Sequence, residues 1–430
     1  MQEVIVIGGG LAGSEASFFL ANNGIKVKLF EMRPAKTTDA HHSDKLGELV
    51  CSNSLKSKEL TNACGLLKQE MEVFDSLVMK VAKKSEVPGG NALCVDREQF
   101  SAQITNIIHN HPLIEVINEE VTSIPTGIPV IIATGPLTSP TLTKVLEDII
   151  GKNLLSFFDA SAPIITKDSI NMDIAYFKSR YEQGDDAYLN CPFTKEEYDR
   201  FYDALINAKL APIRDMDTKY FDGCMPVEVM AKRGIKTLRF GPLKPRGLGR
   251  TKDDRPYAVL QLRQDNVIGS LYNIVGFQTN LTYSEQQRVF RLIPGLENAE
   301  FIRYGLMHRN TYINAPRVLN IDMSVKGNEN IYIAGQLSGV EGYVESAASG
   351  LYVAIQILIK MKGKNFEYPK DTMLGNLMFY ITRANPDNFA PMNANFGIYP
   401  GANKENRLEI AEKSINNTKE FKERLYEYNA

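Results

Sequence analysis

The chain has 430 residues, of which 43% are hydrophobic and 23% charged, and a formal net charge of −2 at pH 7. This is the composition of an ordinary globular protein, long enough for about two to three domains. It excludes a protein coated in basic surface, and no apolar run reaches the ~20 residues of a membrane span. Because the first predicted strand begins at residue 3, we expect no signal peptide and a cytoplasmic protein. Five widely spaced cysteines without a CxxC pair indicate reduced thiols, and we expect no metal site.

The first predicted element is a dinucleotide-binding βαβ unit. A strand from Val4 runs into glycines, a helix over 14–23 follows, and a second strand ends at Glu31. The glycines allow a tight turn, approach of backbone to a pyrophosphate, and close packing of helix on strand, while the acid accepts hydrogen bonds from ribose hydroxyls. Such an acid favours FAD or NAD over NADP; the alternative is a glycine-rich turn without a ligand. The residues predicted to bind the dinucleotide here are Gly8, Gly9, Gly10, Leu11, Ala12, Gly13 and Glu31.

The next elements continue this domain. Residues 40–56 are polar and predict a loop containing His41, His42 and Cys51, and the apolar spacing over 57–80 predicts a helix. A strand over 92–95 leads into a helix capped by Asp96, and strands follow over 113–117 and 130–135. The last of these ends in Ala-Thr-Gly135, a turn that passes close beneath the cofactor.

A related signal returns late in the chain, where a strand over 330–335 ends in glycine and a helix of small residues follows. We expect this segment to close the same cofactor site, with Gly335, Gln336, Gly339, Val340, Glu341 and Gly342 along the flavin. The fold class predicted is α/β: a Rossmann-like FAD-binding domain of the glutathione-reductase type, split by an inserted α+β domain. The predicted boundaries are 1–160 and 309–430 for the two parts of the FAD-binding domain, with a C-terminal helix over 402–430, and 161–308 for the insertion.

Charge is uneven along the insertion. Nine basic residues between positions 232 and 255 accompany only Asp253 and Asp254. Such a local excess can hold a polyanion although the whole chain is nearly neutral; the alternative is a solvated loop.

Several phrases are more specific than those of a generic flavoprotein. They are GELVCSNS (47–54), GCMPVE (223–228), LRFGPLKP (238–245), QLRQDN (261–266), GLMHRN (305–310), GQLSGVEGYVE (335–345) and PMNANF (391–396). Together they closely resemble the TrmFO family of folate- and FAD-dependent tRNA (uracil-5-)-methyltransferases, from Val4 to about Gly397. The opening unit and Val95-Asp96-Arg97 also resemble the longer flavoproteins that modify the tRNA wobble uridine.

The resemblance implies a reaction. A methylene group passes from 5,10-methylenetetrahydrofolate to C5 of a uracil in RNA, reduced FAD converts it to methyl, and NADH or NADPH restores the flavin. Uracil C5 is a poor nucleophile, so a thiolate must add at C6, and a base must later remove the C5 proton. The family assigns these tasks to two cysteines, which match Cys51 and Cys224. Cys51 is expected at a helix entrance, where N–H dipoles favour the thiolate.

The resemblance also distributes the remaining roles. Cys51 belongs to the flavin domain and Cys224 to the insertion, so we assign Cys224 as nucleophile and Cys51 as base or flavin-side partner. His308 resembles the residue that covers the pterin of folate, with Arg309 and Asn310 as polar anchors. The basic stretch then predicts salt-sensitive RNA binding, with phosphate contacts from Arg246, Arg250 and Arg255.

Three alternatives remain open. The first is the same chemistry on 23S ribosomal RNA instead of the T-loop uridine at tRNA position 54, and it would share every catalytic phrase. The chain lacks tryptophan and is rich in Lys, Asn and Ile, as is typical of AT-rich genomes, where such a change of substrate is plausible. An NAD(P)H–flavin oxidoreductase acting on a small molecule is disfavoured by the absence of a redox CxxC and of a second GxGxxG. A flavin-containing RNA-binding protein without catalysis is disfavoured by the two cysteines. The sequence does not determine the oligomeric state, and a monomer is the default expectation.

Overall fold

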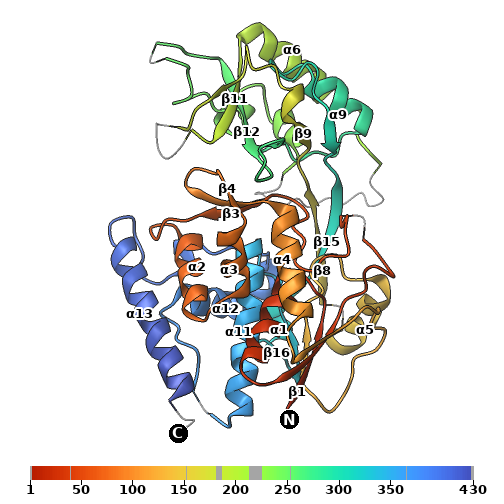
Figure 1. Cartoon of the computed structure of the whole chain (residues 1–430), viewed down its shortest axis with the longest axis vertical. Coiled ribbons are helices and arrows are strands. Elements are labelled where there is room, and N and C mark those ends of the chain that lie inside the picture. Colours follow the sequence, from red (N-terminus) through yellow and green to blue (C-terminus); the bar gives the residue numbers. More distant parts are fainter. Residues whose placement is uncertain are drawn as a thin grey trace.

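The computed structural model describes residues 2–38, 40–151, 153–180, 186–212, 225–251, 253–364 and 366–427. Figure 1 shows two bodies joined along one side, with both termini in the lower one. One hydrophobic core draws on residues 4–150 and 312–425, and the other on residues 165–301.

The lower body is built on a parallel sheet. Its strand order is β16-β17-β7-β1-β2-β6, and every neighbouring pair is parallel except β16 and β17. The strands are β1 (Glu3–Ile7), β2 (Lys26–Phe30), β6 (Ile114–Ile117), β7 (Val130–Ile132), β16 (Ser324–Val325) and β17 (Asn328–Ile333). The late strand β17 therefore pairs with β7, so the chain completes after residue 324 a sheet that it began at residue 3. This fits a parallel sheet with buried, nearly continuous apolar strands.

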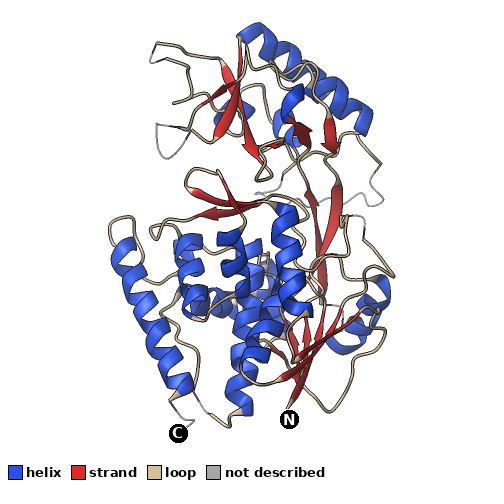
Figure 2. Ribbon diagram, viewed as in Figure 1, coloured by secondary structure: helices blue, strands red, loops and turns tan. Residues whose placement is uncertain are grey.

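Most helices of this body gather on one side of the sheet, and α5 lies apart from them (Figures 1 and 2). The helices of this body are α1 (Leu11–Asn22), α2 (Ala63–Val73), α3 (Leu77–Lys84), α4 (Arg97–His109), α5 (Pro140–Ile150), α10 (Ala315–Val318), α11 (Tyr343–Met361), α12 (Met373–Arg383) and α13 (Arg407–Tyr426). A small sheet, β3 (Ser54–Ser57), β5 (Ala92–Val95) and β4 (Glu86–Val87), lies at the top of this body (Figure 1). Among the described residues, α11 is long and apolar enough to span a membrane, but 78% of that window is buried inside the protein, as in a core helix.

The single helix expected over 57–80 is wrong. The chain forms β3, then α2 and α3, and the break falls at Asp75, whose φ is +61°. Ser76 caps α3 by accepting a hydrogen bond from Met79 N, and a left-handed residue followed by a cap ends one helix and starts the next. The apolar spacing continues across this corner because both helices face the same core, which is why periodicity alone misses it.

Two buried glutamates hold helix starts in this body. Glu15 accepts hydrogen bonds from Leu77 N and Val78 N, and Glu70 accepts them from Met373 N and Leu374 N. The free N–H groups and positive dipole at a helix start favour such carboxylates. Burial nevertheless outweighs these bonds and raises the pKa of each carboxyl to about 7.

The upper body contains an antiparallel sheet of order β10-β11-β12-β13-β9-β14. Its strands are β9 (Ile164–Thr166), β10 (Tyr176–Phe177), β11 (Tyr188–Phe193), β12 (Ala258–Gln264), β13 (Leu271–Ile274) and β14 (Phe301–Arg303), and its helices are α6 (Lys195–Ile206), α7 (Val227–Lys232), α8 (Thr237–Phe240) and α9 (Tyr283–Phe290). The antiparallel pair β8 (Leu154–Ala160) and β15 (Met307–Ile313) carries the chain between the two bodies (Figure 1).

Candidate functional site: a dinucleotide cleft beside Cys51

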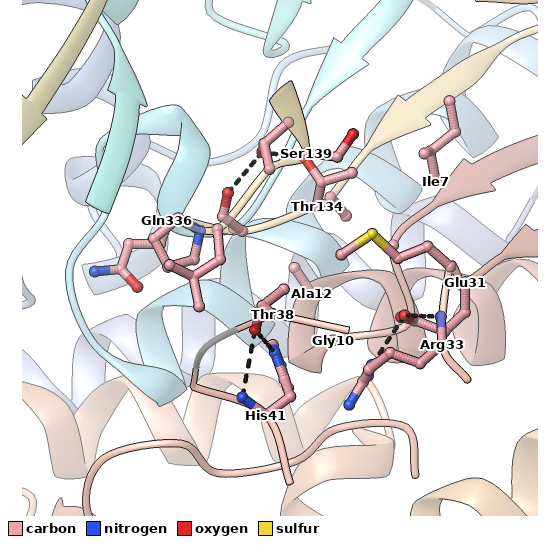
Figure 3. Close-up of a pocket in the computed structure, with 18 of the residues that line it drawn as sticks. Ile7, Gly10, Ala12, Glu31, Arg33, Thr38, His41, Thr134, Ser139 and Gln336 are labelled. Atoms are coloured by element: carbon pink, nitrogen blue, oxygen red, sulfur yellow. Dashed lines mark hydrogen bonds and ion pairs between the residues drawn. The ribbon is translucent and has the colours of Figure 1, made fainter. Parts of the chain in front are cut away.

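A cleft opens where the parallel strands end, at the carboxyl edge of β1, β7 and β17. It encloses about 1030 Å³, including space open to solvent, and reaches from Glu31 to Gln336. Figure 3 shows Gly10 and Ala12 at the start of α1, with Thr134 and Ser139 on the opposite wall. Ligands of open α/β sheets bind at this edge of the strands.

The glycine turn after β1 has the geometry that a phosphate cradle requires. Gly8 has a φ of +105°, and a Cβ there would lie 2.5 Å from the carbonyl oxygen of Ala133. A Cβ on Gly13 would lie 1.9 Å from the carbonyl oxygen of Gly8, so α1 packs against the turn only with glycine. A Cβ on Gly10 would meet nothing within 4 Å, and no side chain caps α1. The helix start therefore faces open space, as an anion site does.

Glu31 lies at the far end of this cleft and is already hydrogen-bonded within the protein. It accepts from Gly9 N at 2.9 Å and from Arg33 Nε at 2.9 Å. Burial alone would raise its pKa, but Arg33 and the Gly9 N–H lower the pKa below its ordinary value. An ionised carboxylate keeps further acceptor capacity for ribose hydroxyls. Arg33, which also bonds Glu48, is a site residue that the sequence reading missed.

The structure places the predicted dinucleotide residues in two groups. Lining the cleft are Gly8, Gly10, Leu11, Ala12, Glu31, Gly135, Gly335 and Gln336. Gly13, inside α1, and Gly9, Gly339, Val340, Glu341 and Gly342 are not among the residues that line it. Val340, for example, is fully buried and pairs with Met392, and a Cβ on Gly339 would lie 2.6 Å from the Phe389 ring.

Two further residues that line the cleft have no role assigned from the sequence. His41, whose role the sequence left unassigned, lines the cleft with its Nδ1 2.6 Å from Thr38 Oγ1 (Figure 3). Burial, reinforced by the charge of Arg33, lowers the pKa of His41 to about 4, so the ring is neutral at neutral pH. Tyr343, the first residue of α11, also lines the cleft.

Cys51 lies next to this cleft, but not at a helix entrance as predicted. It sits in a bend before β3, and α2 begins only at Ala63. Instead, the Tyr343 hydroxyl accepts hydrogen bonds from the backbone N–H groups of Cys51 (2.7 Å) and Ser52 (3.1 Å). Positive charge near Cys51 comes from the guanidinium groups of Arg97 and Arg303, both of which interact with it.

Arginines from both bodies hold the segment around Cys51. Arg97 at the start of α4 donates to the carbonyl oxygens of Leu49 and Cys51, each at 2.8 Å, while its Nε contacts the Asp265 carboxylate at 2.9 Å. Arg263 on β12 donates to Asn53 Oδ1 at 3.0 Å, and its NH2 group donates to Ser52 Oγ at 2.6 Å.

These contacts join two of the specific phrases, GELVCSNS (47–54) and QLRQDN (261–266). Asn53 in turn donates to the carbonyl oxygen of Gln264 at 2.9 Å. Residues of the QLRQDN phrase in the upper body therefore hydrogen-bond to residues of the GELVCSNS phrase in the lower body. These bonds fix the position of Cys51 relative to the two bodies.

The predicted folate residues lie on β15. Its His308 pairs with Asp159 of β8, and Thr311 N donates to the carbonyl oxygen of Pro136 at 2.8 Å, which brings β15 to the turn after β7. The side chains of His308 and Arg309 are outside the described set, and Asn310 is buried. Cys224 lies outside the described residues, so its predicted role as nucleophile stays a prediction.

The three arginines named in the basic stretch are exposed, but their contacts differ. Arg246 and Arg255 are exposed, and no ion pair of either is recorded among the described residues. Arg250 instead lies over the Tyr176 ring, 4.9 Å from its centroid, and donates to the carbonyl oxygens of Asp173 and Ile174. Its guanidinium is therefore engaged in fixing this loop to β10.

Comparison with known proteins agrees with this architecture. A family model described as glucose inhibited division protein A matches residues 3–365. A Staphylococcus epidermidis protein named methylenetetrahydrofolate–tRNA-(uracil-5-)-methyltransferase TrmFO is 58% identical over 407 residues, covering 94% of this chain and 93% of the relative. The chain belongs to the TrmFO family. A Listeria monocytogenes protein of the same name is 54% identical over 433 residues, covering 99% of this chain and all of that relative.

The comparison with solved structures bears on the fold. The solved structure of Aquifex aeolicus GidA matches with a TM-score of 0.72 at 17% identity, covering 98% of this chain and 73% of that one. At this identity the match shows the fold alone, and it confirms the predicted Rossmann-like α/β class.

Proposed function

We propose that this TrmFO-family chain transfers the methylene carbon of 5,10-methylenetetrahydrofolate to C5 of a uridine in tRNA, giving 5-methyluridine. The observation that carries the proposal is the dinucleotide cleft that ends beside Cys51, with Tyr343 touching both. FAD held in this cleft would, in its reduced form, supply the hydride that turns methylene into methyl, and NADH or NADPH would restore the reduced flavin. The glycine turn, the uncapped start of α1 and Glu31 fit such a dinucleotide.

Cys224 and Cys51 carry out different steps of the covalent chemistry. The thiolate of Cys224 adds to C6 of the uracil, which makes C5 enolate-like, and C5 attacks the methylene carbon as one of the two bonds from that carbon to folate nitrogen breaks. Cys51 then takes the C5 proton as the remaining bond from this carbon to folate nitrogen breaks, which releases tetrahydrofolate and leaves an exocyclic methylene on C5 while Cys224 stays bonded to C6. Addition of hydride to this methylene re-forms the C5–C6 double bond as the Cys224 thiolate leaves. His308, Arg309 and Asn310 on β15 are the proposed folate contacts, because this strand reaches the turn after β7.

The cysteine roles are tested with RNA that contains 5-fluorouridine at the target position. Fluorine at C5 cannot leave as a proton does, so the adduct at C6 persists. We expect a covalent complex with wild type and Cys51→Ala and none with Cys224→Ala. A stable adduct in Cys224→Ala that is lost in Cys51→Ala reverses the assignment.

We propose the T-loop uridine at tRNA position 54 as the target, on the resemblance of the catalytic phrases to the family. Mass spectrometry of tRNA and 23S ribosomal RNA from a deletion strain checks it. Loss of 5-methyluridine from tRNA alone supports the proposal, whereas loss from ribosomal RNA alone shows that the same chemistry acts on the other RNA. Loss from neither, with flavin turnover on a small acceptor and no folate requirement, favours an oxidoreductase.

A further inference from the structure

A second cleft lies between the two bodies, on the other side of the segment that leads to Cys51. It encloses about 2030 Å³, including space open to solvent, and is lined by the loop from Ala40 to Val50, the start of α4, and residues of β9, β14 and α9. Figure 1 shows α4 in the lower body and α9 in the upper one. Glu48 and Val50 line both this cleft and the dinucleotide cleft, so the two cavities meet at the residues just before Cys51.

The wall of the upper body carries three stacked aromatic rings. Tyr304 is stacked on Phe301, with centroids 5.4 Å apart and planes 7° apart, and on Tyr283, with centroids 4.6 Å apart and planes 19° apart. Phe301 packs against the core of the upper body, while Tyr283 and Tyr304 line the cleft. Tyr283 is 54% exposed. It therefore forms the outer end of a stack whose inner end is anchored in the core.

The stack is fixed in orientation from two sides. Gln287, one turn along α9 from Tyr283, donates a hydrogen bond to the Tyr304 hydroxyl. Arg303, next to Tyr304, crosses to the lower body and donates to the carbonyl oxygens of Val50 (2.7 Å) and Ala40. One arginine thus connects the ring stack to the residue that precedes Cys51.

The chemistry of the cleft suits a base better than a phosphate. Its carboxylates Asp265 and Glu48 pair with Arg97 and Arg33, Asp96 accepts from backbone N–H groups, and Glu98 pairs with Lys45. Charges of both signs are present, so the cleft has no large positive excess. An exposed aromatic face on a rigid support stacks with any unpaired base, in contrast to phosphate sites, which need positive charge.

We propose that Tyr283, backed by Tyr304 and Phe301, is the stacking platform for an unpaired RNA base that neighbours the target uridine. The proposal rests on the proposed function and adds an RNA-binding surface to it, separate from the basic stretch. Stacking on Tyr283 holds the nucleotide that neighbours the target in this second cleft. The target base itself can then reach the place beside Cys51 where the two clefts meet. The platform is tolerant of base identity, because every base has a π face.

The test compares Tyr283→Ala with Tyr283→Phe, which keeps the ring, and with Phe379→Ala, which removes an exposed aromatic of α12 in the lower body. Alanine is the best helix former, so the first turn of α9 tolerates it. We expect Tyr283→Ala to weaken RNA binding roughly five- to hundred-fold, as loss of one base stack does. Tyr283→Phe and Phe379→Ala should bind as wild type does, and reduction of the bound flavin by NADPH without RNA should be unchanged in all three.

Two results overturn the platform. One is wild-type RNA affinity and methylation in Tyr283→Ala. The other is a change from dimer to monomer in Tyr283→Ala by light scattering, since the rings would then belong to an interface between copies of the chain. The proposed function fails separately, when the wild-type enzyme methylates no RNA.

Discussion

Replacing Arg97 by alanine should both destabilise the protein and displace Cys51. The Arg97 side chain is 11% exposed and its partner Asp265 only 4%, so the variant leaves a buried carboxylate without its cation. Breaking a buried pair in this way costs about 3–5 kcal/mol of the free energy of unfolding. The carbonyl oxygens of Leu49 and Cys51 also lose their donors. A displacement of about 1 Å at a reacting group costs on the order of 100-fold in rate.

Urea denaturation followed by circular dichroism measures the first effect, since the chain has no tryptophan. Single-turnover methylation measures the second. Arg97→Lys keeps the charge but cannot reach Asp265 and both carbonyl groups together, so it should recover stability more than rate. The double variant Arg97→Ala, Asp265→Ala should be more stable than Arg97→Ala alone, because no charge is left buried. Wild-type stability together with wild-type rate in Arg97→Ala would refute the reasoning.

Three further predictions follow from the same structure. Gly10→Val should fold normally yet purify without flavin absorbance near 450 nm, because the valine side chain fills the phosphate cradle. Gly13→Ala should lose both flavin and stability. Flavin retained in Gly10→Val counts against the cradle. Because the pKa of Glu70 is raised to about 7 in the folded protein, folding favours the protonated acid, so this contribution to stability is present below about pH 4.5 and is lost as the pH rises towards 7. Denaturation midpoints across this range should fall less steeply in Glu70→Gln than in wild type, and equal slopes contradict the assignment. Arg246→Ala and Arg255→Ala together should lower the salt dependence of RNA affinity by about two phosphate contacts, and an unchanged slope excludes them as contacts.

Local patterns predicted the parts of the fold that depend on neighbours in sequence. The glycine turn and Glu31 located the first unit, and Asp96 does cap α4 by accepting from Gln99 N, as the sequence indicated. The break at Asp75 escaped detection because the residues on both sides of it face one core. The prediction of a helix entrance at Cys51 was wrong, because the surroundings of Cys51 are formed by residues distant in sequence.

The contacts that hold residues 49–53 around Cys51 show most clearly why the site could not be predicted from the sequence. Arg97 and Asp265 are 168 positions apart, and Tyr343 meets the Cys51 N–H across 292 positions. The phrases containing them could be recognised, but not their pairing. A similar limit applies to Arg250, whose guanidinium direction depends on the backbone of residues 173–174 rather than on its own neighbours.

The central claim is that this chain moves a folate carbon onto a uridine of tRNA. The most direct measurement incubates the purified protein with FAD, NADPH, unmodified tRNA and 5,10-methylenetetrahydrofolate labelled in its methylene carbon, and follows nucleosides by mass spectrometry. The account predicts labelled 5-methyluridine that is lost when Cys51 or Cys224 is replaced by alanine. Unlabelled 5-methyluridine, or oxidation of NADPH without any carbon transfer to RNA, would contradict it.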